Sequence, residues 1–439
     1  MAATTTTLTP DLLVRTYTKD KHFEQFAQLA TPFWTELEKA EAEIPAGQGL
    51  YFDIWLADAH ATASIAEAGD LPATGQPTVV TGSVTAIQTF SSFGVSELFL
   101  EASKNGGSIG IDAINRHVQM CTRDLMFEIN RQALTSHGTG RMGVVQTTTV
   151  TLTTVVMRNP EGVLQFREGM KVDAYDTDTG GSKQGSTLVI SDVNIDTRTL
   201  TFTATASLTA GWGLYRAAST TVSAYGIAMN GLRGEADNGP LQATIFGLSR
   251  STYPGLNATV LTAGGGTQPW SEALLRKAAH RATLRSGAEI TDIWTNYGVL
   301  SEHLNQTVSN TIYDAGTGPG VPTYDVGYKK LPSLLVNGRS IPYRIDGVLP
   351  AREMILVPKS ILRKHVLRDP SWVGDDTGRG GSASPVLMQQ PGTATGNYAT
   401  AKIAGQGAMM NQTCKMPKQL VRITEIADAE LAGDPAPTS

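Results

Sequence analysis

Leu50-Tyr-Phe-Asp-Ile-Trp55 is the first of two extended, β-prone runs that decide the fold of this chain, and Thr78-Val-Val-Thr-Gly-Ser-Val-Thr-Ala-Ile-Gln-Thr-Phe90 is the second. Both lie between Lys39 and Lys104, a part of the chain without lysine, arginine or asparagine. The two runs predict one long hairpin, because the sequence between them holds the turn-forming residues Gly69, Pro72, Gly75 and Pro77. A hairpin with so little core of its own is at best marginally stable alone. We therefore expect its partner to be another part of the molecule or another molecule, which makes assembly the leading hypothesis.

The composition suits a protein of several domains with much of its surface hidden in contacts. The chain has 439 residues, which suggests two or three domains. A hydrophobic content of 41% suffices for real cores, whereas a charged content of 17% is low against an average of about 25%. The net charge of −5 argues against a dedicated nucleic-acid-binding protein, which would carry a basic excess.

The cysteines and the apolar runs bound the class of protein further. Cys121 and Cys414 are too few for a disulfide framework or a CxxC metal site, and Cys121 is expected in the core of a helix. No run approaches the roughly 18 apolar residues of a membrane-spanning helix. The N-terminal residues Met1–Leu8 lack the basic start and apolar core of a signal peptide. We expect synthesis in the cytoplasm and no membrane contact.

A long amphipathic helix is predicted directly after the hairpin. Apolar residues recur at spacings of three and four from Ile111 to Ala133, and charged residues occupy the other faces. At roughly 1.5 Å per residue this helix is about 35–40 Å long. Gly138 and Gly140 are expected to end it.

Residues 146–222 change to a Thr-rich β pattern. Leu200, Phe202 and Ala204 alternate with threonines at a period of two. Ser186–Val193 and Arg198–Thr205 predict a hairpin around a polar turn. We expect a compact β-rich domain inserted between the long helix and later mixed sequence.

Mixed helix and strand are expected after residue 222. The patterns predict helices at 270–286 and 298–308, and strands at 290–294, 351–358 and 420–426. The strongest hairpin signal joins residues 334–336 to residues 339–345, because Asn337-Gly338 suits a type I′ turn. Residues 374–384 are expected to form a flexible loop and residues 427–439 a disordered tail.

Two glycine motifs are weighed as catalytic or cofactor sites. Gly106-Gly-Ser108-Ile-Gly110 matches the GxSxG pattern, but a hydrolase serine follows a buried strand, and residues 101–105 are polar and loop-like. Ser108 is therefore expected to help start the long helix. Gly138-Thr-Gly140-Arg-Met-Gly143 matches GxGxxG but follows a helix instead of a strand, so helix termination and a flexible link are expected.

The histidines, three aspartates and one basic cluster are the remaining candidate binding sites. None of the seven histidines stands at HxxxH spacing, and Asp173, Asp176 and Asp178 lack the closing glutamate of a calcium loop, so a plain turn is favoured. A basic cluster on the helix at 270–286 could contact phosphate, but a solvated face is favoured because net charge gives no support; its members are Arg276, Lys277, Arg281 and Arg285.

The order of a leading arm, a long hairpin, a spine helix and a larger mixed domain resembles a tailed-phage major capsid protein of the Hong Kong 97-like fold. Four stretches carry the resemblance: Gly47–Leu56, Ala66–Pro72, Val84–Leu98 with Phe93-Gly94, and Asp124-Leu-Met-Phe-Glu-Ile-Asn-Arg131. In order of parts it covers nearly the whole chain except residues 146–222.

The resemblance implies an α+β fold divided along the chain. Its expected parts are an N-terminal arm (1–45), an E-loop (46–100), a P domain with the spine helix (101–145), an inserted β-rich domain (146–222), an A domain with P-domain segments (223–385), a return to the P domain (386–427) and a flexible tail (428–439).

The resemblance also implies a function. The chain would self-assemble into pentamers and hexamers of an icosahedral phage head that encloses double-stranded DNA, after synthesis in the host bacterial cytoplasm. Expected partners are further copies of the chain, a separate scaffolding protein, a portal and non-specifically contacted DNA, with a decoration protein as a candidate. No catalytic residue, cofactor or metal is implied. A bacterial nanocompartment shell is a close alternative; a serine hydrolase using Ser108 and a β-rich tail protein or adhesin are alternatives of other classes.

The charges of the hairpin predict how it is held. One member of this fold class cross-links its subunits through an E-loop lysine, which this chain lacks. Noncovalent burial must then hold the shell. The hairpin is acidic and needs cationic neighbours, so its predicted intersubunit contacts are Asp53, Asp58, Glu67 and Asp70. We expect Glu67 or Asp70 to pair with an arginine or lysine on an adjacent P domain or arm.

Overall fold

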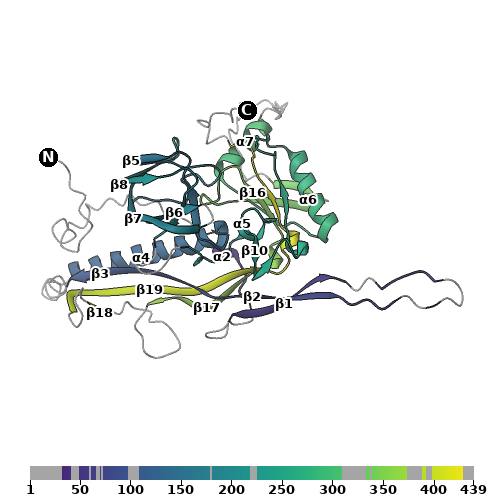
Figure 1. Cartoon of the computed structure of the whole chain (residues 1–439), viewed down its shortest axis with the longest axis horizontal. Helices are drawn as coiled ribbons and strands as arrows, with labels where there is room; N and C mark the ends of the chain where they lie inside the picture. Colours follow the sequence, from purple (N-terminus) through teal and green to yellow (C-terminus); the bar gives the residue numbers. More distant parts are fainter. Residues whose placement is uncertain are drawn as a thin grey trace, which may run out of the picture.

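The structure, a computed structural model, places a long helix along an elongated antiparallel sheet, with two further sheets on the other side of the helix (Figure 1). The residues that it describes are 32–40, 49–58, 61–65, 70, 73–96, 108–177, 180–217, 225–308, 333–336, 339–372, 388–391 and 398–428. The expected loop at 374–384, the turn at 337–338 and the tail from residue 429 lie outside these residues.

Helix α4 (Ser108–Thr135) is the predicted long helix. Its buried residues Leu125, Ile129 and Ala133 repeat at the expected spacing and belong to the largest core cluster. Cys121 is buried beside Trp372, as expected of a core residue. The helix ends before Gly138, whose φ of 80° is a left-handed conformation that favours glycine.

The sheet beside α4 is built around β19 (Tyr398–Cys414). β3 (Ile87–Ser96) pairs with one edge of β19, while β17 (Leu362–Trp372) and β18 (Met388–Pro391) pair with the other, all antiparallel. The sequence patterns predict none of β17, β18 and β19. Figure 1 shows α4 running along β3 and β19, so the helix and this sheet form one elongated layer pair.

A six-stranded mixed sheet forms the second core, in the order β12-β20-β16-β13-β15-β14. Its strands are β12 (Thr259–Leu261), β13 (Asp292–Thr295), β14 (Ser333–Val336), β15 (Arg339–Ile345), β16 (Met354–Val357) and β20 (Val421–Ile423). Val336 pairs with Arg339, which confirms the predicted hairpin.

Helix α6 (Glu272–Ser286) packs on this sheet and confirms the second predicted helix. Ser271 caps its start by accepting a hydrogen bond from the backbone N–H of Leu274, and Gly287 ends it at a φ of 67°. Helix α7 (Tyr297–Val308) confirms the third.

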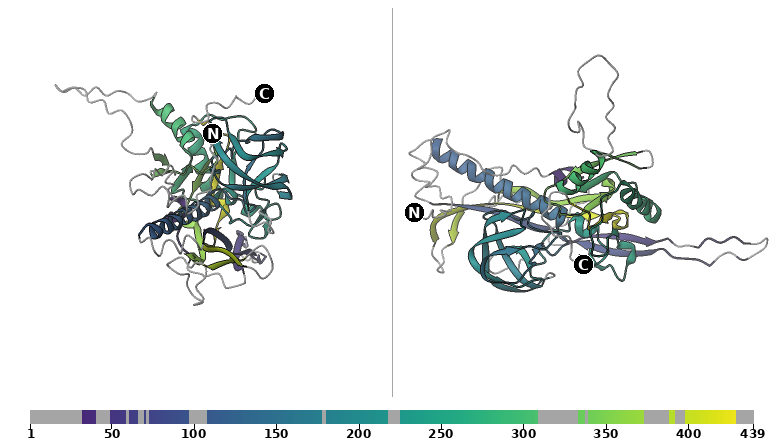
Figure 2. Two further views of the ribbon diagram at one scale, coloured as in Figure 1. Left: turned by 90° about the vertical axis from the view of Figure 1, so that its left-hand side faces the viewer. Right: turned by 90° about the horizontal axis from the view of Figure 1, so that it is seen from above.

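A third sheet closes on itself, in the order β4-β9-β6-β7-β8-β5 (Figure 2). Backbone hydrogen bonds from Gln146 N to Val156 O (2.9 Å) and from Arg158 N to Val144 O (2.8 Å) join the two end strands. Apolar residues from all around it, such as Met142, Ile190 and Phe202, form a core of its own. The strands are β4 (Arg141–Val144), β5 (Thr149–Val156), β6 (Lys171–Thr177), β7 (Gly180–Asn194), β8 (Thr199–Leu208) and β9 (Gly213–Arg216).

The sequence predicts one hairpin and one flexible link within this sheet. The predicted hairpin is β7 and β8, with Asn194 opposite Thr199. The predicted flexible link at residues 138–143 was wrong in part, because Arg141–Val144 is a buried strand. Gly143 suits that strand: a Cβ there would lie 2.8 Å from the Met157 side chain, so glycine leaves room for the core. The spacing of the glycines gives no sign that Gly143 packs against the core of this sheet.

The last part of the expected arm, residues 32–40, packs into the core of its own chain. Helix α2 (Pro32–Glu36) buries Phe33 and Trp34 against α4, and the backbone N–H of Trp34 donates to Asn130 Oδ1 at 3.1 Å. Ala40 N and Glu38 O both hydrogen-bond to the backbone of Lys364. Residues 1–31 and 41–45 of the expected arm lie outside the described residues.

Short elements lie between the closed sheet and the mixed sheet in the sequence. Helix α5 (Leu232–Glu235) and the strands β10 (Thr244–Ile245) and β11 (Leu248–Ser249) connect the sheets. Asp173 is buried in β6 and pairs with Lys183 at 2.8 Å. Within the described residues no group of three or more metal-ligating side chains converges, and no helix is long and apolar enough to cross a membrane.

Candidate intersubunit surface

The predicted hairpin is a two-stranded ribbon that projects from the body of the molecule (Figure 1). β1 (Leu50–Ala57) pairs antiparallel with β2 (Thr78–Val84), so that Tyr51 lies opposite Ser83 and Trp55 opposite Val79. The second predicted run divides after Val84, because the chain then enters β3 and pairs with β19. The ribbon is therefore continuous with the sheet beside α4.

One face of the ribbon is fixed to the body. Ile54 and Val84 are buried against Phe246, and the rings of Phe52 and Phe246 meet edge to face at 5.2 Å. Ser83 N donates to Phe246 O at 2.9 Å. A Cβ on Gly82 would lie 3.2 Å from both Ile54 and Phe246, so glycine permits this close approach.

The opposite face of the ribbon exposes large apolar side chains. Tyr51 is 66% exposed, Trp55 70% and Val79 40%. Asp53 lies between the two aromatic residues along β1 and accepts a hydrogen bond from Thr81 Oγ1 at 3.0 Å. Scattered exposed apolar residues are ordinary, but a row of them on a projecting ribbon indicates a surface that another molecule covers.

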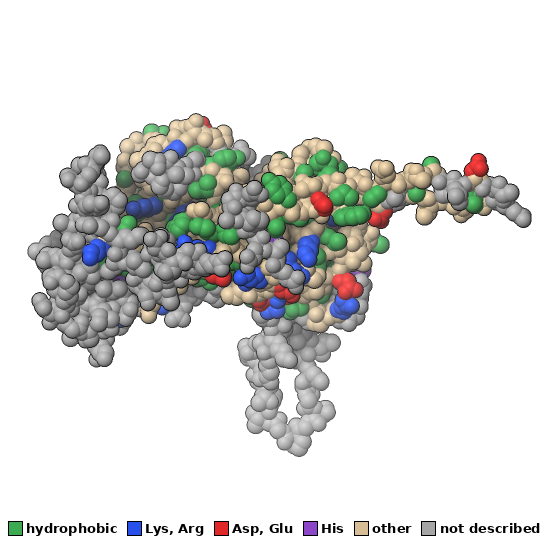
Figure 3. All heavy atoms as spheres, turned by 90° about the horizontal axis from the view of Figure 1, so that it is seen from below, with side chains coloured by type: hydrophobic (Ala, Val, Ile, Leu, Met, Phe, Trp, Pro, Cys, Tyr) green, Lys and Arg blue, Asp and Glu red, His purple; other side chains and the backbone are tan. Residues whose placement is uncertain are grey.

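The ribbon carries negative charge and no positive charge. Asp53, Asp58 and Asp70 are exposed, and none forms an ion pair within the part of the chain that the structure describes. Glu67 lies outside the described residues. Figure 3 shows carboxylate and hydrophobic side chains on the projecting ribbon, whereas lysine and arginine side chains gather on the body. The structure thus places three of the four predicted contact residues on one projecting element, without testing what they contact.

The carboxylates of the ribbon were predicted as contacts from the sequence, whereas Tyr51 and Trp55 were not. A signal was present, because Leu50–Ala57 is apolar on both faces of a strand: Phe52 and Ile54 alternate with Tyr51 and Trp55. An isolated ribbon with one anchored face can bury only one of these two sets within its own chain.

The other candidate sites are largely structural. The basic cluster on α6 includes Arg276, which pairs with Glu272 on the same helix at 2.7 Å, and Arg285, which donates to Ala258 O at 3.1 Å. Helix α4 begins at Ser108.

No protein-family model matches this sequence, and no curated protein matches it. Among solved structures, the chain is similar to one described as the cyanophage A-1(L) capsid asymmetric unit, with a TM-score of 0.54 and 13% identity over 92% of this chain and 95% of that chain. It is also similar to a chain of Gordonia phage Cozz (TM-score 0.44, 10% identity, 97% of each chain) and to one of the holo-SrpI encapsulin complex from Synechococcus elongatus PCC 7942 (TM-score 0.43, 7% identity, 95% of each chain).

The likeness to the cyanophage chain shows the fold. It extends over nearly the full length of both chains, and the α+β architecture is that of a capsid subunit with the Hong Kong 97-like fold, as the sequence predicted. At 13% identity the likeness speaks of the fold alone.

Proposed function

We propose that this chain is a major capsid protein that self-assembles into the pentamers and hexamers of an icosahedral phage head enclosing double-stranded DNA. The observation that carries the proposal is the β1–β2 ribbon, which is anchored on one face and exposes Tyr51, Trp55 and Val79 on the other. In this reading the ribbon is the E-loop, α4 is the spine helix of the P domain, the mixed sheet is the A domain, and the closed sheet is the inserted β-rich domain.

The exposed face suits a contact that is weak singly and strong collectively. Burying two exposed aromatic residues and a valine contributes on the order of 5 kcal/mol of gross hydrophobic free energy. Much of that is offset by the lost freedom of the subunit and its ribbon. A misplaced subunit can then dissociate, whereas closure of rings through repeated heterologous contacts holds the correct ones.

The acidic side chains of the ribbon favour a basic surface on the neighbouring subunit. We propose Asp53, Asp58, Glu67 and Asp70 as intersubunit contacts, with Glu67 or Asp70 paired to an arginine or lysine of an adjacent P domain or arm. A structure of the assembled shell with both carboxylates in solvent would contradict that pairing. Because the hairpin has no lysine, noncovalent contacts hold the shell, with a scaffolding protein, a portal and packaged DNA as further partners.

Electron microscopy of the purified chain, alone and co-produced with a phage scaffolding protein, tests the proposal. We expect icosahedral shells or rings of five and six subunits. Monomers that never assemble under either condition would overturn it. Shells that hold a protein cargo and no DNA during infection would indicate a nanocompartment instead. Ser108→Ala shells that form normally, from a chain that has no hydrolase activity to lose, would exclude the serine hydrolase alternative.

A further inference from the structure

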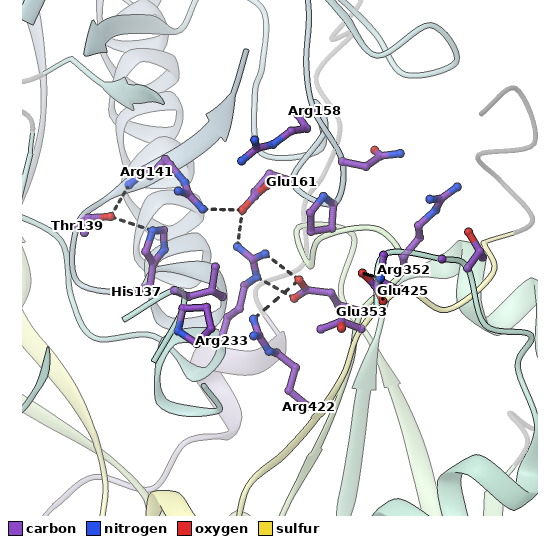
Figure 4. A pocket seen from close by; sticks show the side chains of 18 residues that line it. His137, Thr139, Arg141, Arg158, Glu161, Arg233, Arg352, Glu353, Arg422 and Glu425 are labelled. Atoms are coloured by element: carbon purple, nitrogen blue, oxygen red, sulfur yellow. Dashed lines mark hydrogen bonds and ion pairs between the residues drawn. The ribbon is translucent and has the colours of Figure 1, made fainter. Parts of the chain in front are cut away.

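A buried series of ion pairs joins the closed sheet, helix α5 and the mixed sheet (Figure 4). Glu161, in the loop after β5, accepts from Arg141 Nη2 and from Arg233 Nη1, each at 2.9 Å. Arg233 on α5 also donates two hydrogen bonds to Glu353, each 2.7 Å long. Arg422 on β20 lies 3.9 Å from the same carboxylate. These side chains are nearly inaccessible to solvent, so their charges must be balanced locally.

A cavity of about 410 Å³ opens beside these ion pairs. Its walls come from the start of the closed sheet, the loop that holds Glu161, helix α5, the glycine turn at residues 264–266 and the end of β20 (Figure 4). A water molecule occupies about 30 Å³ of liquid volume, so a small anion and several waters fit together.

The lining of this cavity carries more positive than negative charge. Five arginines line it against three glutamates: Arg141, Arg158, Arg233, Arg352 and Arg422 against Glu161, Glu353 and Glu425. Asp237, behind the wall, pairs with Arg422 at 2.8 Å and offsets one charge.

Glu425 contributes little to balancing the arginines, because the glycine turn engages its carboxylate. Its oxygens accept from Thr262 Oγ1 at 2.6 Å, from Ala263 N at 2.7 Å and from Gly265 N at 3.1 Å. Burial raises the pKa of Glu425, but those hydrogen bonds together outweigh it and lower the pKa, so the carboxylate stays ionised while it accepts from the turn.

A second observation that points to a ligand is that one buried N–H group of Arg422 has no hydrogen-bond acceptor among the described residues. The side chain is 5% exposed, and the group without an acceptor is its Nε–H. Burial lowers the pKa of Arg422 despite the opposing effect of Glu353 and Asp237. Elsewhere in the wall, burial lowers the pKa of His137 well below its usual value, and Arg141 and Arg233 lower it further. The histidine is therefore neutral, and the wall stays cationic through its arginines.

We propose that this cavity is a binding site for an oxyanion, a phosphate or a carboxylate, held by the guanidinium groups of its lining. Guanidinium groups present planar pairs of N–H donors that match the oxygens of both anions. The anion has two possible sources: free phosphate, or a carboxylate of a second copy of the chain. The ribbon projects away from the body of its own chain (Figure 1), so a carboxylate of the ribbon would reach the cavity from a second copy.

Calorimetric titration of the unassembled chain with inorganic phosphate, at constant ionic strength in chloride, tests the site without requiring assembly. We expect saturable binding. Arg158→Ala, at an exposed position on the rim, weakens it at least tenfold. Gly266→Leu blocks it without strain, since a Cβ there meets no atom within 4 Å. Arg276→Ala, which removes an exposed guanidinium on α6, is the matched control and leaves binding unchanged.

The site is disproved if phosphate binding is absent, or if Arg158→Ala and Gly266→Leu both bind as the unaltered chain does. Titration of assembled shells then distinguishes the sources of the anion. Shells that bind phosphate as the free subunits do indicate a free anion. Shells that lose binding and regain it in Asp70→Asn indicate a carboxylate of the second copy. A failure to assemble would contradict the proposed function and leave the titration of free subunits valid.

Discussion

Gly231 lies against Ser136 so closely that no side chain fits between the start of α5 and the end of α4. A Cβ on Gly231 would lie 2.5 Å from the carbonyl oxygen and 2.8 Å from the amide nitrogen of Ser136. Because these are backbone atoms, they cannot swing aside as a side chain would. The contact sets the position of Arg233, two residues further on, which holds Glu161 and Glu353 together.

Gly231→Ala is therefore expected to lower the free energy of unfolding by about 3 kcal/mol, the cost of overpacking a site that cannot relax. Urea denaturation of the unassembled chain, followed by tryptophan fluorescence, measures the change. Gly266→Ala is the control and should stay within about 0.5 kcal/mol, because its Cβ meets open space. An equal loss of unfolding free energy in both variants would show that the contact between α4 and α5 has room for a side chain.

Removing the carboxylate of Glu353 leaves the buried Arg233 without its two short hydrogen bonds. Breaking a buried pair in this way costs about 3–5 kcal/mol, because an uncompensated charge stays in the interior. We expect Glu353→Ala to show that loss in the same denaturation assay. Glu272→Ala breaks the half-exposed pair with Arg276 on α6 and should cost less than about 1 kcal/mol. Similar costs for both variants would argue against the buried network.

Glu235 predicts an unusual dependence of stability on pH. Burial raises the pKa of Glu235 to about 8, against smaller opposing effects from Gln412 and Arg250. Between about pH 4.5 and 8 the unfolded chain has released this proton while the folded chain retains it, so this group lowers stability as pH rises.

Glu235→Gln removes that penalty and keeps the shape of the protonated side chain. We expect the variant to be more stable than the unaltered chain by about 2–4 kcal/mol at pH 8, with a difference under about 1 kcal/mol at pH 5. Denaturation midpoints across this range measure the difference. A difference that stays constant from pH 5 to pH 8 would mean that Glu235 ionises normally.

Trp55→Ala tests the exposed face of the ribbon. The side chain is 70% exposed, so the stability of the subunit should change by less than about 0.5 kcal/mol. If the ring is buried between subunits, the concentration needed for assembly should rise at least tenfold in sedimentation experiments. Ile195→Ala, at an exposed position in the β7–β8 turn, is the control and should assemble normally. Unchanged assembly of Trp55→Ala would remove this face from the contact.

Elements whose pattern is local were predictable from the sequence. The three-and-four spacing in α4, the helical pattern of residues 270–286 and the Asn-Gly signal before Arg339 each act within a short stretch. The ribbon was predictable for the same reason. The break between β2 and β3 was not predictable. Nothing at Thr85 and Ala86 indicates that the strand stops pairing with β1 and starts pairing with β19.

Strand β19 was missed because its neighbours, more than its own sequence, make it a strand. Its Ala- and Gly-rich sequence has a low β-propensity, yet β3 and β17 pair with its two edges. Gly407 lies directly opposite Phe90, and a Cβ there would overlap that ring. The pairing spans more than 300 residues of sequence, which no local pattern can reveal.

The charged cavity was equally hidden. Arg233 meets Glu161 and Glu353, which lie 72 and 120 residues from it in the sequence. Each of these side chains alone resembles an ordinary surface charge. Only the fold brings them together.

The closed sheet begins with β4 and ends with β9, and these two strands are hydrogen-bonded neighbours. Its two ends therefore lie about one strand spacing, roughly 5 Å, apart. Because its two ends adjoin, we expect that another domain can replace this sheet without displacing the rest of the chain. We call the closed sheet with its loops the cassette. One condition applies: Glu161 belongs to the cassette and Arg233 to its host. A replacement must bring its own carboxylate to that junction.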